Sequence, residues 1–107
     1  MLRFLLGDQK TSLPNAGELV AKGALLLDVR TPQEFADDHV IGALNVPVQE
    51  LSSRLDELGP RERPIVIYCR SGARSANAKH LLEGAGFRHV HDMGAMFNVT
   101  GLPRQNG

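Results

Sequence analysis

The sequence has very little cysteine, no net charge and no long apolar run, and each of these shortages excludes a class of protein. Its single cysteine, Cys69, excludes an internal disulfide and a zinc site built from cysteines. Twelve basic and twelve acidic residues cancel, and no basic stripe indicates a nucleic-acid or membrane surface. No apolar run approaches the roughly 18–20 residues that cross a membrane. We therefore expect a protein that binds neither nucleic acid nor membrane.

What the sequence does contain is typical of one ordinary globular domain. Apolar residues make up 42% of the chain and charged residues 22%. We expect residues 1–107 to form one domain, with its core at about 13–103 and an N-terminal edge segment at 1–12. The apolar patch at residues 1–7 is too short for a secretory signal, which predicts a cytoplasmic location. The histidines have no local partners for a metal site, so we expect neither metal nor cofactor.

Short apolar runs bounded by glycine and proline predict the strands. The clearest runs lie at residues 24–29 and 65–68, and a weaker one lies at 87–91. Residues 46–48 and 3–6 are candidates for a brief strand and an edge strand. Runs that are apolar at nearly every position are typical of strands buried on both faces, as in a parallel sheet.

Helical signals fall between these strands. One helix is expected at residues 15–22, and Thr31-Pro32 resembles the start of a second. The apolar spacing over 48–58 predicts an amphipathic helix, and an Ala- and Leu-rich helix is expected at 75–83. The alternation predicts an α/β fold with a central parallel sheet of about five strands, flanked by helices on both faces. Such folds place their chemistry at the carboxyl ends of the strands.

The segment that follows the second strong strand carries the chemistry. Cys69 ends that strand, residues 71–73 have small side chains, and a helix begins near Ser75. Backbone N–H groups of such a loop can turn inward and bind an anion, and the helix dipole adds a positive end. Arg70 and Arg74 add two full charges. The pattern predicts a Cys69 thiolate whose pKa lies below the usual value of about 8.5.

The plain alternative is that Cys69 is a small buried residue at a strand end, as free cysteines often are. That interpretation does not explain the two arginines, the glycine turn and the helix start around it. We therefore favour a reactive cysteine.

The same residues resemble a known family. The run Cys-Arg-Ser-Gly-Ala-Arg-Ser at 69–75 is similar to the active-site loop of rhodanese-homology domains. Residues 26–35 and 39–47 resemble the N-terminal signature of that family, and the resemblance covers about 13–103. It implies the rhodanese-like fold and the single-domain thiosulfate sulfurtransferase type. Four residues separate the loop cysteine from its second arginine, whereas the related cell-cycle phosphatases have one more, which weighs against a phosphatase.

The resemblance also implies a two-step sulfur transfer. The Cys69 thiolate would take a sulfane sulfur from thiosulfate or a persulfide donor and hold it as a persulfide. Cyanide, a thiol or a thioredoxin-like protein would then remove it. The loop residues implied in binding the substrate or anion are Arg70, Ser71, Gly72, Ala73, Arg74 and Ser75. A non-catalytic protein-binding module and a related phosphatase are the alternatives.

Individual roles for the charged residues stay partly open at this point. Arg70 is the candidate for the sulfonate oxygens of the donor. Arg74 either braces the loop and its charge or forms an ion pair with Asp28. Asp28 and Arg30 lie two residues apart at a strand end and support the site. They either shape its rim or, as we favour, form an ion-pair network that holds the loop after the strand.

The C-terminal part departs from the family pattern. The tryptophan of the family is missing, Ala95 stands where a glycine is usual, and the spacer before residues 101–103 is about two residues short. Since this region borders the mouth of the site, the choice of substrate is less well defined by the resemblance. Met96 and Phe97 form an exposed apolar lip or, as we expect, fill the core.

Overall fold

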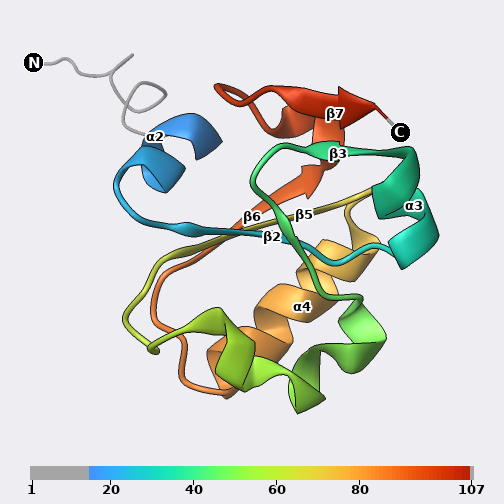
Figure 1. Cartoon of the computed structure of the whole chain (residues 1–107). Coiled ribbons are helices and arrows are strands. Elements are labelled where there is room, and N and C mark those ends of the chain that lie inside the picture. Colours follow the sequence, from blue (N-terminus) through green and yellow to red (C-terminus); the bar gives the residue numbers. More distant parts are fainter. Residues whose placement is uncertain (1–14, 107) are drawn as a thin grey trace, which may run out of the picture.

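The computed structural model describes residues 15–106, in which short strands and helices alternate along the chain (Figure 1). In chain order the elements are α2 (Ala16–Ala21), β2 (Leu25–Asp28), α3 (Pro32–Asp37), β3 (Asp38–Val40), β4 (Leu44–Asn45), the 3₁₀-helices η1 (Val48–Ser53) and η2 (Leu55–Leu58), β5 (Ile65–Cys69), α4 (Ala73–Gly84), β6 (Val90–Ala95), the 3₁₀-helix η3 (Met96–Asn98) and β7 (Arg104–Asn106).

Four of these strands form the central parallel sheet, in the order β4-β2-β5-β6. Strands β3 and β7 form a separate antiparallel pair. The expected α/β class and parallel sheet are confirmed. Within residues 15–106 the sheet has four strands, one fewer than the five or so expected. The expected edge strand at 3–6 lies outside the described residues.

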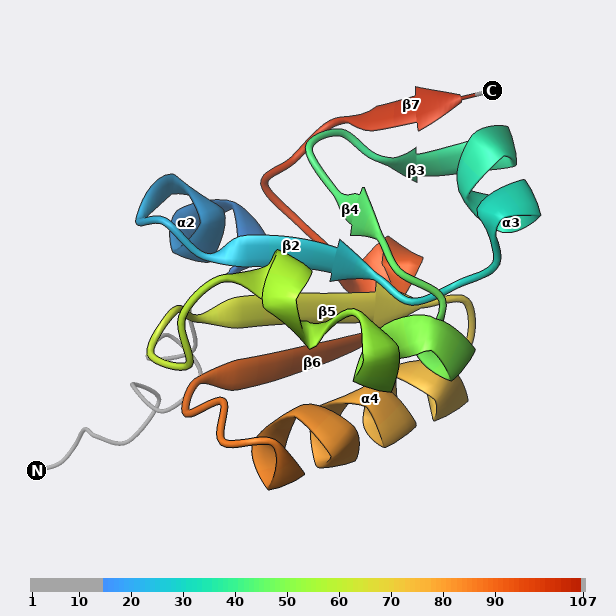
Figure 2. The ribbon, with the colours of Figure 1, turned by 60° about the horizontal axis from the view of Figure 1, so that its bottom comes forward.

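Helices and loops cover both faces of the sheet and bury its central strands β2 and β5 (Figure 2). Ile65, Ile67 and Cys69 of β5 face a core shared with α4, η1 and η2. Val66 and Tyr68 face the opposite core, which α2 and β3 cover. Alternate side chains of one strand therefore enter two different cores, which explains why residues 65–69 are apolar at nearly every position and fully buried.

Two helices begin where the sequence predicts, and for the expected reason. Asn15 caps α2, and its side chain and that of Glu18 form a reciprocal capping box. Thr31 and Glu34 form a second capping box at the start of α3, with Pro32 at the first helical position. The second capping box holds the Glu34 carboxylate at the end of the sheet where Cys69 lies.

The expected amphipathic helix over 48–58 is wrong in type. The segment forms two 3₁₀-helices, η1 and η2, that meet at Arg54. The Ser53 hydroxyl donates to the Glu50 carbonyl, a local bond that competes with the helical ladder. The apolar spacing nevertheless identified the buried side chains, because Leu51 and Leu58 are fully buried.

Two of the weaker strand expectations also differ from the structure. The expected strand at 87–91 is β6, and it begins only at Val90 because the Phe87 N–H still closes the end of α4 on the Leu82 carbonyl. The expected strand at 46–48 is wrong, because the brief strand β4 lies just before it at Leu44–Asn45 and Val48 already begins η1 after Pro47, a residue with no N–H for the ladder.

Candidate active site

Cys69 lies at the carboxyl end of β5, next to the carboxyl end of β2, where Asp28 pairs in register with Tyr68. The chain runs from β2 to β4 on one side and then returns to β5 on the other. Parallel sheets bind ligands at such a reversal, outside the carboxyl ends of the strands. The fold thus places the only cysteine of the sequence at the position that favours a functional site.

The loop after Cys69 folds back over its sulfur. The Gly72 N–H donates to the Cys69 Sγ across 2.9 Å, and Gly72 is the N-cap of the twelve-residue helix α4. Gly72 has a φ of 109°, in the left-handed region that a residue with a Cβ adopts only with strain. The positive end of the α4 dipole therefore points at a fully buried sulfur.

These contacts set the ionisation of the thiol. Burial raises the pKa of Cys69, but hydrogen bonds from the Ser75 hydroxyl and from the N–H groups of Ser75, Gly72 and Ser71 lower it by more. The Ser75 hydroxyl also lies 3.0 Å from the Gly72 carbonyl, and its O–H rotates to either acceptor. The net pKa of Cys69 is lowered, as the sequence predicts.

Removing the Ser75 hydroxyl is expected to raise the pKa of Cys69. Ser75 is fully buried, so Ser75→Ala removes one donor to the thiolate and changes little volume. The rate of alkylation by iodoacetamide against pH measures the change: the midpoint lies below about 8.5 in the parent protein and moves up in the variant. Ser53→Ala is the matched control, because that hydroxyl also donates to the carbonyl three residues earlier, but outside the site. Equal midpoints in all three proteins would contradict this account of the thiolate.

Arg74 is held by Glu34 and not by Asp28. Its two terminal nitrogens lie 2.7 and 3.0 Å from the two oxygens of the Glu34 carboxylate, in a bidentate ion pair. The hydrogen bonds from the Arg74 guanidinium are the largest of the effects that lower the pKa of Glu34 to about 2. The pairing of Arg74 with Asp28, one of the two expected roles, is therefore wrong. The charge of Arg74 still acts on the Cys69 sulfur.

Asp28 is paired instead with Arg30, two residues along the chain. Both side chains are buried, and an Arg30 terminal nitrogen lies 2.7 Å from Asp28 Oδ2. Arg30 also donates to the Asp38 carbonyl at 2.6 Å, and the Asn45 amide bridges the carbonyls of Asp28 and Arg30. These contacts form the ion pair of the favoured interpretation, and its role in holding the loop after β2 stays a prediction.

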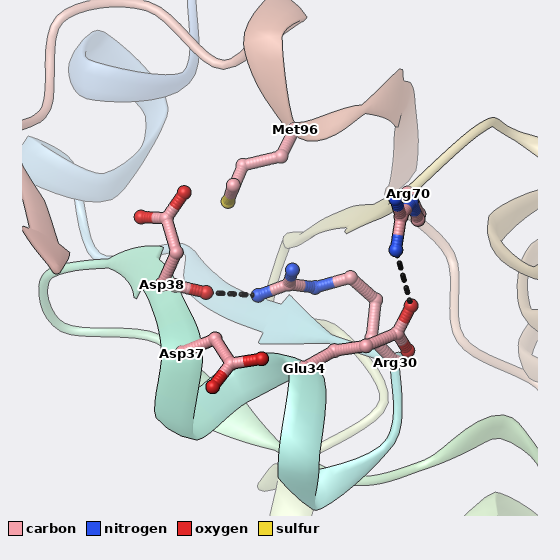
Figure 3. A pocket seen from close by; sticks show the side chains of 6 residues that line it. All are labelled: Arg30, Glu34, Asp37, Asp38, Arg70 and Met96. Carbon is pink, nitrogen blue, oxygen red and sulfur yellow. Dashed lines mark hydrogen bonds and ion pairs between the residues drawn. The ribbon is translucent and has the colours of Figure 1, made fainter. Parts of the chain in front are cut away.

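A pocket of about 320 Å³ lies beside the loop (Figure 3). The residues that line it are Arg30, Glu34, Asp37, Asp38, Arg70 and Met96. The Arg70 side chain is 76% exposed and lies 3.8 Å from Glu34. Met96 is half-buried against the second core, whereas Phe97 is 75% exposed, so the expectation that both fill the core is wrong for Phe97.

Glu34 is the site residue that the sequence interpretation missed. The sequence predicts a helix start at Thr31-Pro32 but gives Glu34 no role in the site, yet the Glu34 carboxylate contacts both loop arginines. A half-buried arginine usually has a carboxylate partner, but that rule alone led to Asp28 and not to Glu34. The capping box was the available signal, because it fixes the Glu34 side chain at the end of the sheet that holds Cys69.

Comparison with known proteins decides the family. The rhodanese-like domain family matches residues 12–97, most of the chain. The chain belongs to the rhodanese-like domain family. The family expected from the sequence is thereby confirmed.

Relatives of this rhodanese-like domain include proteins named as sulfurtransferases, and the match covers more than two thirds of their length. It is 33% identical over 82 residues to the thiosulfate sulfurtransferase PspE of Escherichia coli, which covers 76% of this chain and 78% of the relative. It is 35% identical over 97 residues to the human thiosulfate:glutathione sulfurtransferase, which covers 78% and 84%. The solved rhodanese with anions from E. coli superposes with a TM-score of 0.74 at 29% identity, over 79% of this chain and all of the other.

Residues 15–106 contain neither a membrane-spanning helix nor a cluster of metal-binding side chains. None of the helices in that part of the rhodanese-like domain has the length and apolar character to cross a membrane. The same part of the chain holds no group of three or more His, Cys, Asp and Glu side chains placed to bind a metal ion.

Proposed function

We propose that this rhodanese-like domain is a sulfurtransferase that carries a sulfane sulfur on Cys69. The environment of Cys69 supports this proposal most. The Cys69 sulfur is buried at the end of β5 and accepts a hydrogen bond from the Gly72 N–H, and the pKa of the thiol is lowered. A thiolate held in this way is a nucleophile without a histidine base. The names of its relatives support the same chemistry.

In the first step the Cys69 thiolate attacks the outer sulfur of thiosulfate. A sulfur–sulfur bond forms to Cys69, the bond between the two thiosulfate sulfurs breaks, and its electron pair leaves with sulfite. In the second step cyanide or a thiolate attacks the outer sulfur of the persulfide and restores the Cys69 thiolate. The N–H groups of the loop would stabilise the negative outer sulfur, as an oxyanion hole stabilises oxygen.

The acceptor in the cell is proposed to be a thiol, either a small molecule or a thioredoxin-like protein. Such an acceptor must reach a sulfur on a buried cysteine, and the pocket lined by Arg70 and Glu34 opens beside that loop. The single-domain organisation and cytoplasmic location expected from the sequence are part of the same proposal.

Arg70 is proposed to bind the sulfonate oxygens of the donor. Its side chain is 76% exposed, and among residues 15–106 its one ion pair is a long contact of 3.8 Å to Glu34, so it has capacity to bind an anion at the pocket. We expect Arg70→Ala to lower kcat/KM for thiosulfate roughly tenfold, the size of one charged hydrogen bond, with a smaller effect on kcat/KM for cyanide. Arg88→Ala, an exposed arginine outside the pocket, is the control. Equal losses of kcat/KM for thiosulfate and for cyanide would show that the sulfonate of the donor binds elsewhere.

Steady-state kinetics of thiocyanate formation from thiosulfate and cyanide test the function as a whole. A persulfide intermediate predicts parallel lines in double-reciprocal plots, because sulfite leaves before cyanide reacts. A rate of thiocyanate formation no higher than the uncatalysed rate would contradict the proposed sulfurtransferase activity. It would favour a protein-binding module, and hydrolysis of p-nitrophenyl phosphate would then test the phosphatase alternative.

A further inference from the structure

The side chain of Arg30 is fixed in the wall of the pocket by contacts to three other residues. Its Nε and Nη2 atoms donate to the Asp28 carboxylate across 3.0 and 2.7 Å, and Nη2 also donates to the Asp38 carbonyl across 2.6 Å. The guanidinium carbon lies 5.5 Å from the centre of the buried Tyr68 ring. These contacts hold the guanidinium in one position, and they use the N–H groups of Nε and Nη2.

The second terminal nitrogen of Arg30, Nη1, remains available. An arginine Nη1 carries two N–H groups, and within residues 15–106 neither has an acceptor. The only buried side-chain atom without a partner in that part of the chain is Asp38 Oδ1, so Nη1 borders open space although Arg30 is only 5% exposed. In Figure 3 one terminal nitrogen of Arg30 is bonded to another residue of the pocket and the other is not. A buried and immobile arginine thus presents two N–H groups to the pocket that it lines.

We propose that Arg30 Nη1 binds the sulfonate oxygens of the sulfur donor, together with Arg70. The proposal rests on the proposed function, because it names a further substrate-binding residue for the same reaction. Arg70 is 76% exposed and loses side-chain freedom when it binds an anion, whereas Arg30 is already ordered by its neighbours. Donors fixed in advance bind an oxyanion at a lower entropic cost.

The bond from Nη1 should strengthen as the donor reacts. The Cys69 thiolate attacks the outer sulfur of thiosulfate, a sulfur–sulfur bond forms to Cys69, and the bond between the two thiosulfate sulfurs breaks. Its electron pair leaves with sulfite, so negative charge that the outer sulfur shared moves onto the sulfite. Hydrogen bonds to the sulfite oxygens are therefore stronger in the transition state than in bound thiosulfate, which raises kcat.

The carboxylates of the pocket give the proposal a test of sign. The Glu34 carboxylate is bound by Arg74, whereas the carboxylates of Asp37 and Asp38 lie on opposite sides of the Arg30 guanidinium (Figure 3). Negative charge opposes an oxyanion, so Asp37→Asn, a change at an exposed residue, should tighten oxyanion binding roughly twofold. Weaker oxyanion binding in Asp37→Asn would contradict the proposed site.

Binding is measured first, without any sulfur transfer. Sulfite is titrated into the sulfur-free protein, and NMR signals of the arginine side-chain N–H groups report where it binds. We expect saturable shifts of the Arg30 signals. Arg54 is the internal control, because its Nε, Nη1 and Nη2 atoms all donate to Glu50 and Glu57. Arg30→Lys keeps a positive charge for Asp28 but has no Nη1, so it should bind sulfite roughly tenfold more weakly.

Transfer is measured next, as the rate at which Cys69 acquires sulfur from two donors. Thiosulfate has sulfonate oxygens, whereas tert-butyl persulfide has no oxygen at all. Arg30→Lys should slow loading by thiosulfate roughly tenfold and loading by the persulfide less than about twofold. The matched control is Arg54→Lys, which changes an arginine ion pair outside the pocket and should slow neither donor. Equal slowing with both donors would show that Arg30 acts only by holding the fold, and would overturn the proposal.

The outcomes distinguish this proposal from the proposed function. Sulfur loading in a protein whose Arg30 signals shift no more with sulfite than those of Arg54 would overturn the Arg30 site and leave the sulfurtransferase. Saturable shifts at Arg30 in a protein that never acquires sulfur would support the oxyanion site and contradict the sulfurtransferase. The titration of the parent protein decides these cases even if Arg30→Lys does not fold.

Discussion

Cys69→Ser is expected to abolish sulfur transfer and to leave the fold intact. A serine hydroxyl does not ionise near neutral pH, so the loop N–H groups have no anion to stabilise and no nucleophile attacks the donor. We expect a loss of kcat of roughly 10³-fold or more in thiocyanate formation. The oxygen would replace the sulfur as the acceptor of the Gly72 N–H, so the buried donor keeps a partner.

Thermal unfolding of the same variant separates loss of chemistry from loss of structure. Cys69 is fully buried in the core beneath α4, and serine is only slightly smaller. We expect a far-UV circular dichroism spectrum like that of the parent and a Tm within a few degrees of it. Retained turnover in Cys69→Ser would remove the mechanism, whatever its Tm.

Glu34→Gln is expected to have the second largest effect, although Glu34 does not contact the Cys69 sulfur. Glu34 joins α3 to the loop arginine Arg74 across forty residues of sequence, through two charge-assisted hydrogen bonds. Without that carboxylate the guanidinium of Arg74 loses its fixed position and its electrostatic effect on Cys69. We expect kcat/KM for thiosulfate to fall roughly 10- to 100-fold.

The chain offers a matched control for this substitution. Arg54 and Glu57 form a similar two-bond ion pair at 2.8 and 2.9 Å, but on the exposed surface of η2. Glu57→Gln should leave the kinetics unchanged, since nothing in the site depends on that pair. Equal values of kcat/KM for Glu34→Gln and the parent would show that the ion pair with Glu34 is not needed to position Arg74.

The ion pair between Glu34 and Arg74 should make the free energy of unfolding depend on pH in the acid range. The pKa of Glu34 is about 2 in the folded protein, below the usual value of about 4.3 for an unfolded chain. Its contribution to the free energy of unfolding is therefore complete above about pH 4.3 and is lost as the pH falls toward 2. Urea unfolding across this range should show a steeper loss in the parent than in Glu34→Gln.

Features that depend on neighbouring residues were predictable from the sequence. The capping residues Asn15 and Thr31 act through side-chain bonds to residues three positions away, so the helix starts followed directly. Cys69 at a strand end, with a glycine turn and a helix behind it, likewise required only local chemistry. The lowered pKa of Cys69 followed from the same segment.

Features that depend on distant contacts were not predictable from the same signals. The partner of Arg74 is Glu34 in α3, forty positions away, whereas the rule that an arginine pairs with a carboxylate led to Asp28 at the end of β2. The burial pattern of 48–58 does not distinguish an α-helix from two 3₁₀-helices, because both place Leu51 and Leu58 inward. Apolar character alone assigned Phe97 to the core, whereas the tertiary fold leaves it exposed.

Intact-protein mass spectrometry before and after thiosulfate tests the central claim most directly. Transfer of one sulfane sulfur to Cys69 predicts a gain of about 32 Da that cyanide removes, since persulfidation is a reversible modification of a thiolate. The gain should be absent in Cys69→Ser. No gain with thiosulfate or with a persulfide donor, in folded protein whose Cys69 still reacts with iodoacetamide, would contradict a sulfur-carrying cysteine.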